Sequence, residues 1–287
     1  MSRRGRACPH HHGQFLSPVQ EGKAAGTRTV KVTILGCGPS AGVPLIGGNW
    51  GTCNPDNPKN RRTRPSVLVE TYGTSILIDT SPDLRAQLLA AKIGRVDAVL
   101  YTHDHADHVH GIDDLRTVYR LMDRRRIPAY ADPVTLASII RRFPYVFEGH
   151  GEVEAMYRPI LNAREIDGPF AVGPVRVVPF VQDHGICVTL GFRIGRFAYS
   201  TDVVRLDDAA FEALVGIELW IVDCLRAGEE HPTHANLATT LGWIARVKPR
   251  RAIFTHMNHQ ADYDALKVLC PAGVEPGYDG MVLDLAD

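Results

Sequence analysis

Apolar residues fall in short runs separated by polar turns, and the runs have two different periods. Alternating or continuous runs rich in β-branched residues predict strands, at 30–36, 66–71, 74–80, 96–103, 127–131, 175–181, 188–195, 196–202, 218–224, 251–256 and 277–285. Apolar residues at helical spacing predict helices, at 81–92, 112–122, 133–143, 207–215 and 234–247. Strands mixed with helices in both halves indicate an α/β (α+β) protein, with two sheets packed face to face and helices outside.

The N-terminal segment differs from the remainder of the chain. Residues 1–29 are Arg-rich and lack the apolar core of a secretion signal, so we expect a disordered leader followed by one domain over 30–287. Within the leader, Cys8 lies close to His10–His12 and could bind a stray metal ion. An unstructured tail is the simpler expectation.

The charge balance, the cysteines and the apolar runs indicate which partners and which cellular compartment to expect. Lys+Arg and Asp+Glu number 32 each, so net charge favours neither nucleic acid nor an anionic membrane. Local basic runs are expected to be solvated faces, at 59–64, 123–126, 141–142 and 248–251. The six cysteines are far apart without a C-x-x-C pair, and no apolar run approaches a membrane span, so we expect a reducing cytoplasmic location.

One short motif concentrates potential metal ligands directly after an apolar strand. His103, His105, Asp107 and His108 form the pattern H-x-H-x-D-H. Imidazole nitrogens and carboxylate oxygens are ligands for zinc, manganese and iron. Because strand ends commonly carry functional sites in such architectures, a turn here can bring these side chains together around a metal.

Three later residues complete a larger ligand set, because each follows an apolar strand of its own. The expected first metal ligands are His103, His105 and His184; the second set is Asp107, His108 and His256; Asp202 bridges both. Two divalent ions at such a site can activate water and stabilise a developing oxyanion.

This pattern resembles the metallo-β-lactamase superfamily. Within that superfamily the stretches "GVP", "YSTD", "VDC", "THMNHQ" and "GYDGM" are similar to PhnP-like phosphodiesterases, which hydrolyse phosphoribosyl cyclic phosphate. The resemblance covers residues 30–287 and implies a four-layer αβ/βα sandwich with two divalent ions, zinc or manganese. It also implies a metal-dependent hydrolase acting on a small cyclic or nucleotide-like phosphodiester.

The resemblance and the strand ends suggest further roles. His234 matches a mobile histidine of the PhnP-like family, and we expect it at a helix start as general acid or oxyanion clamp, with His231 as the rival. Asp107 is a candidate catalytic residue as well as a ligand. Asp79 and Asp223 close apolar strands, where a carboxylate needs a partner, so we expect them to orient ligating imidazoles.

One departure from the PhnP-like pattern affects a structural metal. Relatives carry three cysteines that bind a structural zinc together with a histidine, but here only Cys53 and His259 match, while Gly48 and Trp50 occupy the other places. Two ligands do not complete a tetrahedral zinc site, so a hydrogen-bonded or packed loop is expected instead.

Other functions on this fold remain open from the sequence. A tRNA 3′-end processing enzyme would carry an extended arm, and no Gly- and Lys-rich excursion lies between His108 and His184. A thioester or lactone hydrolase would use the same bridging aspartate. A PqqB-like carrier would be expected to have an altered metal set. The expected partner is a small phosphodiester, with nucleic acid and membrane disfavoured and a homodimer left open.

Overall fold

Two seven-stranded sheets form the centre of the protein. The structure is a computed structural model that describes residues 29–148 and 158–286. The first sheet has the order β14-β1-β2-β3-β4-β5-β6. Its strands are β1 (Thr29–Gly36), β2 (Ser66–Thr71), β3 (Thr74–Ile78), β4 (Ala98–Leu100), β5 (Ile127–Ala131), β6 (Leu161–Glu165) and β14 (Val282–Ala286).

The second sheet comes from the later part of the chain and has the order β13-β12-β11-β10-β9-β8-β7. Its strands are β7 (Phe170–Val172), β8 (Val175–Asp183), β9 (Val188–Ile194), β10 (Phe197–Ser200), β11 (Leu219–Asp223), β12 (Arg251–Thr255) and β13 (Val274–Pro276). The chain returns at its end to pair β14 antiparallel with β1, so the first sheet contains both ends of the described chain.

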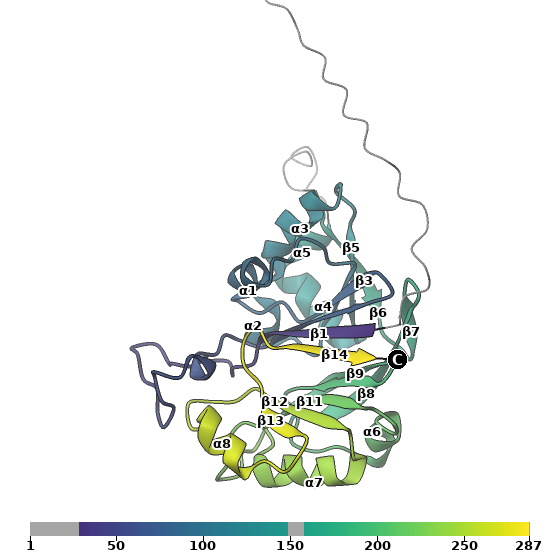
Figure 1. The fold of residues 1–287 in the computed structure, drawn as a ribbon. Helices are drawn as coiled ribbons and strands as arrows, with labels where there is room; N and C mark the ends of the chain where they lie inside the picture. The colour runs from purple at the N-terminus through teal and green to yellow at the C-terminus, as the bar shows by residue number, and fades with distance from the viewer. Residues whose placement is uncertain (1–28, 149–157, 287) are drawn as a thin grey trace, which may run out of the picture.

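Helices cover the outer faces of both sheets. Those over the first sheet are α1 (Leu84–Ala90), α3 (Leu115–Leu121), α4 (Pro133–Arg142) and α5 (Pro144–Phe147); those over the second are α6 (Asp208–Ala213), α7 (Leu237–Val247) and α8 (Tyr263–Leu269). Short helical turns are η1 (Pro58–Asn60), α2 (Ala106–Val109) and η2 (Ile112–Asp114). Figure 1 shows the sheets facing each other with a helical layer on either side, which confirms the predicted four-layer sandwich.

Strand periodicity explains how one sheet supports two cores. Val67 and Val69 of β2 pack in the core between the sheets with Phe192, whereas the intervening Leu68 packs against the outer helices with Leu84. Alternate side chains of a strand point to opposite faces, so both faces of a covered sheet must be apolar. Each fully buried aliphatic side chain contributes about 1.5–3 kcal/mol.

Two helix starts differ from the sequence prediction. The helix expected from residue 81 begins at Leu84, because the Ser81 hydroxyl and carbonyl accept hydrogen bonds from Asp83 and Leu84 in a turn. The helix expected from residue 234 begins at Leu237, where Asn236 is the N-cap and accepts from the Thr239 amide. His234 therefore precedes the helix by three residues.

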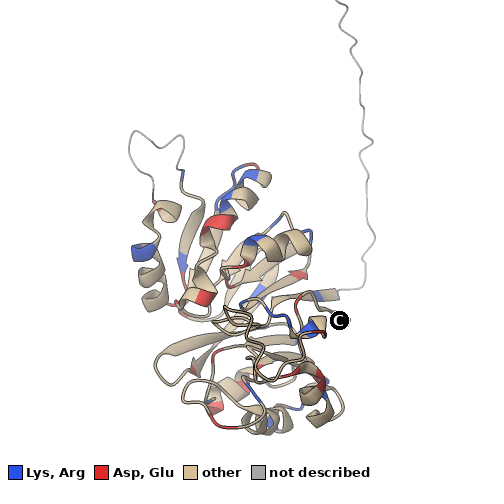
Figure 2. Cartoon of the chain, turned by 90° about the vertical axis from the view of Figure 1, so that its left-hand side faces the viewer, with Lys and Arg blue, Asp and Glu red and all other residues tan. Residues whose placement is uncertain are grey.

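Other predictions also need correction. Thr29, assigned to the leader, belongs to β1, while Cys8 and His10–His12 lie outside the described residues. The run 59–64 is not wholly a solvated face, because Arg62 is 2% exposed. Figure 2 shows basic and acidic residues interspersed over both halves of the described chain.

No helix among the described residues is long and apolar enough to cross a membrane.

Candidate metal centre

The seven predicted ligands lie together at one edge of the sandwich. They follow the ends of four strands, β4, β8, β10 and β12, of which β10 and β12 each pair parallel with β11 between them. The carboxyl ends of parallel strands meet at one sheet edge, so their following loops converge there. Six of the seven side chains are buried and His105 is partly exposed.

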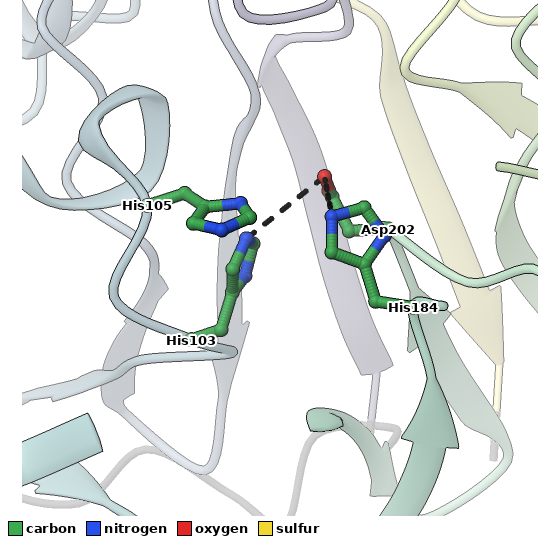
Figure 3. A group of neighbouring side chains, drawn as sticks. All are labelled: His103, His105, His184 and Asp202. Atoms are coloured by element: carbon green, nitrogen blue, oxygen red, sulfur yellow. Dashed lines mark ion pairs between the residues drawn. The ribbon is translucent and has the colours of Figure 1, made fainter. Parts of the chain in front are cut away.

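The first group joins residues from both halves of the chain. The ligand atoms of His103, His105, His184 and Asp202 lie within 4.8 Å of one another. Asp202 Oδ1 is 3.9 Å from His103 Nε2 and 3.7 Å from His184 Nε2. Figure 3 shows His103 and His105 reaching in from one side and His184 with Asp202 from the other.

The second group shares Asp202 with the first. Asp202 Oδ2 lies 3.1 Å from His108 Nε2, and Asp202 Oδ1 lies 3.4 Å from His256 Nε2. Asp107 Oδ2 is 3.4 Å from His108 Nε2 and 3.5 Å from His256 Nε2. The one-turn helix α2 supplies Asp107 and His108, so this part of the motif is helical and not a simple loop.

Three residues with positive φ lie at the same edge. Asp79, Asp202 and His256 follow strands with φ of 62°, 53° and 59°, in the left-handed region. This conformation is uncommon for residues other than glycine, although aspartate and histidine adopt it more readily than most, and such residues cluster at functional sites. The three strand ends are therefore bent so that these side chains face the centre.

Hydrogen bonds fix which imidazole nitrogen faces the centre. His108 Nδ1 donates to Asp79 Oδ2 at 2.7 Å, so the expected orienting role of Asp79 has a matching contact. The Thr102 hydroxyl donates to Asp79 at 2.8 Å and accepts from His103 Nδ1 at 3.0 Å. His184 Nδ1 donates to the Thr233 carbonyl at 2.7 Å. Each Nε2 lone pair is left for the centre.

Several buried atoms of the centre have no hydrogen-bond partner in the described structure. They are Nε2 of His103, Nε2 of His108 and both ring nitrogens of His256. Leaving such buried polar atoms unpaired costs about 1–3 kcal/mol each. A divalent cation would accept the Nε2 lone pairs of these three histidines and balance the carboxylates, so the residues present fit metal ions.

The electrostatic environment suits metal ligation. Burial, together with the neighbouring His108, holds the pKa of His103 well below its usual range, which keeps that imidazole neutral. Burial alone would raise the pKa of Asp202, but His256 and His108 outweigh it and hold that carboxyl ionised. Burial alone would lower the pKa of His108, but the carboxylates of Asp202, Asp107 and Asp79 outweigh it and raise that pKa well above its usual range. Neutral imidazole and ionised carboxylate are the forms that bind metals, so a metal ion that binds here displaces the extra proton of His108.

His234 lies beside the ligands and forms a pair with Asp223. His234 Nδ1 is 2.9 Å from Asp223 Oδ2, its Nε2 is 3.9 Å from Asp202 Oδ1, and its ring stacks on His256 with centroids 4.5 Å apart. Burial lowers the pKa of His234, but the Asp223 carboxylate outweighs this and raises it to about 9. Asp223 was expected to orient a metal ligand; it contacts His234 instead.

The loop that carries Cys53 is packed by protein groups. Arg62 Nη1 lies 3.9 Å from Cys53 Sγ and donates to the Asn258 carbonyl at 3.2 Å, while Nη2 donates to the Ala261 carbonyl at 2.7 Å. Cys53 and His259 are in no metal-compatible group of the described residues. The packed loop was the expectation; the buried Arg62 that holds it was not anticipated.

Three groups that support the centre were missed in the sequence. Thr102 and the Thr233 carbonyl orient imidazoles, but threonine is common in strands and a backbone carbonyl has no signature in the sequence. Asp223, His234 and His256 also form a third metal-compatible group, which was not predicted because His234 was expected to act as a general acid and not as a ligand.

Comparison with known proteins agrees with this geometry. Residues 74–257 match the Beta-lactamase superfamily domain. An octanoyltransferase of Porphyromonas gingivalis is 36% identical over 257 residues, covering 88% of this chain and 51% of that protein. A ribonuclease Z of Methanopyrus kandleri is 32% identical over 140 residues, covering 48% of this chain and 46% of that protein.

The chain thus spans about half the length of these curated relatives. A solved diphosphatase of the PhnP family superposes with a TM-score of 0.82 at 33% identity, covering 90% of this chain and 97% of that one. With the domain match extending over most of the described chain, the comparison confirms the resemblance drawn from the motifs. The chain belongs to the metallo-β-lactamase superfamily, and within it the chain is PhnP-like.

Proposed function

We propose that this chain is a metal-dependent hydrolase that cleaves a phosphodiester or diphosphate linkage in a small molecule. The observation that carries the proposal is the sharing of Asp202 between two His/Asp groups, with the His234–Asp223 pair directly beside them. The likeness to a solved diphosphatase of the PhnP family supports phosphorus as the reaction centre.

Two divalent ions, zinc or manganese, would be held by the two groups that share Asp202. The proposed ligands are His103, His105 and His184 for one ion, and Asp107, His108 and His256 for the other, with Asp202 common to both. Such ions supply Lewis-acid stabilisation of phosphoryl charge and acidify water at neutral pH.

The protein's own groups supply orientation and a proton. Asp79 and Thr102 hold the ligand imidazoles in the tautomer that leaves Nε2 free. His234 keeps Nδ1–H on Asp223, so its imidazolium carries a second proton at Nε2, the atom on the Asp202 side. We assign His234 as the general acid that protonates the leaving oxygen, which typically contributes about 10²–10⁴-fold to the rate. We also propose a catalytic contribution from Asp107, because it contacts both His108 and His256.

A direct test compares linkages on one preparation. Protein loaded with zinc or manganese is assayed with bis(p-nitrophenyl) phosphate, nucleoside cyclic phosphates and nucleoside diphosphates, beside Asp202→Ala as the control. The proposal expects turnover of at least one phosphodiester or diphosphate that is lost in Asp202→Ala. No turnover of any of these compounds by the fully loaded protein would refute it.

Thioester hydrolysis is the second candidate, and one observation favours it. The relative matched over 88% of this chain is named an octanoyltransferase, so its name refers to an acyl group. An octanoyl thioester belongs in the same assay. Hydrolysis of that compound faster than of every phosphate compound would favour this candidate.

Two other candidates have less support. The described residues between α2 and β8 form α3 to α5 and β5 to β7 of the sandwich itself, which offers no support for an added tRNA-gripping arm. A carrier role is disfavoured because the two metal-compatible groups that share Asp202 contain all seven proposed ligands.

A further inference from the structure

The segment 229–234, between β11 and α7, lies against the metal centre and is held at its start by one guanidinium. Arg226 Nε donates to the Glu229 carbonyl and Nη2 to the Glu230 carbonyl, each at 3.0 Å. Its Nη1 donates to Gln260 Oε1 at 2.9 Å. One side chain therefore ties the segment to the loop that follows β12.

The other end of the segment is fixed by the metal centre itself. His184 Nδ1 donates to the Thr233 carbonyl at 2.7 Å. The loop after β8 packs so closely that a Cβ on Gly185 would lie 2.3 Å from the Pro232 carbonyl oxygen. Asp223 then holds His234 at 2.9 Å. A side chain on this segment has a defined position relative to the ligands.

His231 projects from this fixed segment next to the proposed acid. Its ring centroid is 5.3 Å from that of His234, and the residue is partly exposed. His231 Nδ1 lies 3.4 Å from the Thr233 backbone nitrogen and 3.1 Å from the Thr233 hydroxyl. A backbone N–H can only donate, so Nδ1 accepts and the neutral ring carries its hydrogen on Nε2.

The Nε2–H of His231 has no hydrogen-bond acceptor among the described residues. A preoriented N–H donor beside a reaction centre is the group that binds an anionic phosphoryl oxygen most effectively, because no reorganisation is needed when the anion arrives. The fixed segment, the assigned tautomer and the accessible ring together point to a ligand contact.

We propose that His231 is a substrate-binding residue whose Nε2–H donates to a phosphoryl oxygen and places the leaving group next to His234. The inference rests on the proposed function, since it takes the ligand to be a phosphate compound. His231 binds as a neutral donor and transfers no proton, which separates its role from that of His234.

Two amide substitutions test which ring nitrogen matters. In His231→Gln the amide N–H can reach the position of Nε2, whereas in His231→Asn it reaches only the position of Nδ1. Binding of inorganic phosphate to the metal-loaded proteins is measured by calorimetry, together with metal content and Tm. We expect His231→Gln to bind within about threefold of wild type and His231→Asn to bind about tenfold more weakly. Wild-type affinity in His231→Asn, or equal weakening in both variants, would overturn the proposal.

Turnover separates failure of this inference from failure of the proposed function. With bis(p-nitrophenyl) phosphate, His231→Asn is expected to raise KM about tenfold while kcat changes less. If the wild type cleaves no phosphate compound but the two variants still differ in phosphate binding, the proposed function fails and the contact stands. If the wild type is active and both variants match it in KM and in phosphate binding, the contact is refuted alone.

Discussion

Replacing Asp79 by Asn tests how the centre holds the His108 imidazole in the tautomer that can bind metal. Asp79 accepts from the Thr102 amide, the Thr102 hydroxyl and His108 Nδ1, at 2.8, 2.8 and 2.7 Å. In Asp79→Asn, the side-chain oxygen can still accept from the Thr102 backbone N–H. The side-chain NH₂ then points toward the Thr102 hydroxyl and the His108 Nδ1–H. Two donors then meet, and His108 relieves the conflict by moving its hydrogen to Nε2, the atom needed for metal.

The substitution is not expected to change the backbone conformation at position 79. Asp79 has φ of 62°, and asparagine tolerates the left-handed region as well as aspartate does. Losing one charge-assisted hydrogen bond costs about 1.5–3 kcal/mol, which corresponds to about 10- to 150-fold. Loss of a group that orients a metal-bound histidine typically costs about 10- to 100-fold in metal affinity, so we expect a decrease in that range.

Competition with a chromophoric chelator measures the metal affinity of Asp79→Asn directly, with Tm as the check on folding. The matched control is Asp113→Asn, which changes an exposed carboxylate that contacts Arg116 at 3.4 Å. That exposed pair contributes about 0–1 kcal/mol, so the control should bind metal like wild type. Wild-type affinity in Asp79→Asn would refute the tautomer argument.

Three further predictions follow from the same site. Asp202→Ala should lose hydrolysis together with metal content, measured by elemental analysis; full activity would remove its shared role. His234→Gln should lower kcat by about 10²–10⁴-fold with metal retained, and loss of metal instead would make His234 a ligand. In chelator, His234 has a pKa raised from about 6.5 to about 9, so its stabilisation is complete below about 6.5 and is lost as pH rises through 9. Denaturant unfolding from pH 6.5 to 9.5 should show a larger decrease in wild type than in His234→Gln, where other groups with a raised pKa such as His108 still contribute, and identical pH profiles would contradict it.

The convergence of the seven proposed ligands could be predicted because its signal is local. His184 and His256 directly follow strands, and Asp202 lies two residues after one, so strand prediction placed all three at sheet ends. Their convergence with the motif at 103–108 required only that the ends of the strands meet at one edge. Two face-to-face sheets were predicted because short apolar runs with strand periodicity recur in both halves of the chain, separated by clear turns.

Other features were missed, either because a local signal was misplaced or because they depend on contacts between distant segments. The helix was expected to start at His234, but the residue whose side chain caps it is Asn236, so the helix starts at Leu237. Strand β6 was missed because its sequence, LNARE, is polar and half-exposed at a sheet edge. Arg62 in a basic run gives no hint that it is buried against the Asn258 and Ala261 carbonyls.

The central claim is that one carboxylate, Asp202, serves two metal ions at once. Elemental analysis of protein purified without chelator tests it most directly, with Asp202→Ala prepared in parallel. We predict about two transition-metal ions per chain in the wild type, and a marked loss in the variant. A wild-type content of one ion or fewer, or an unchanged content in Asp202→Ala, would contradict the account.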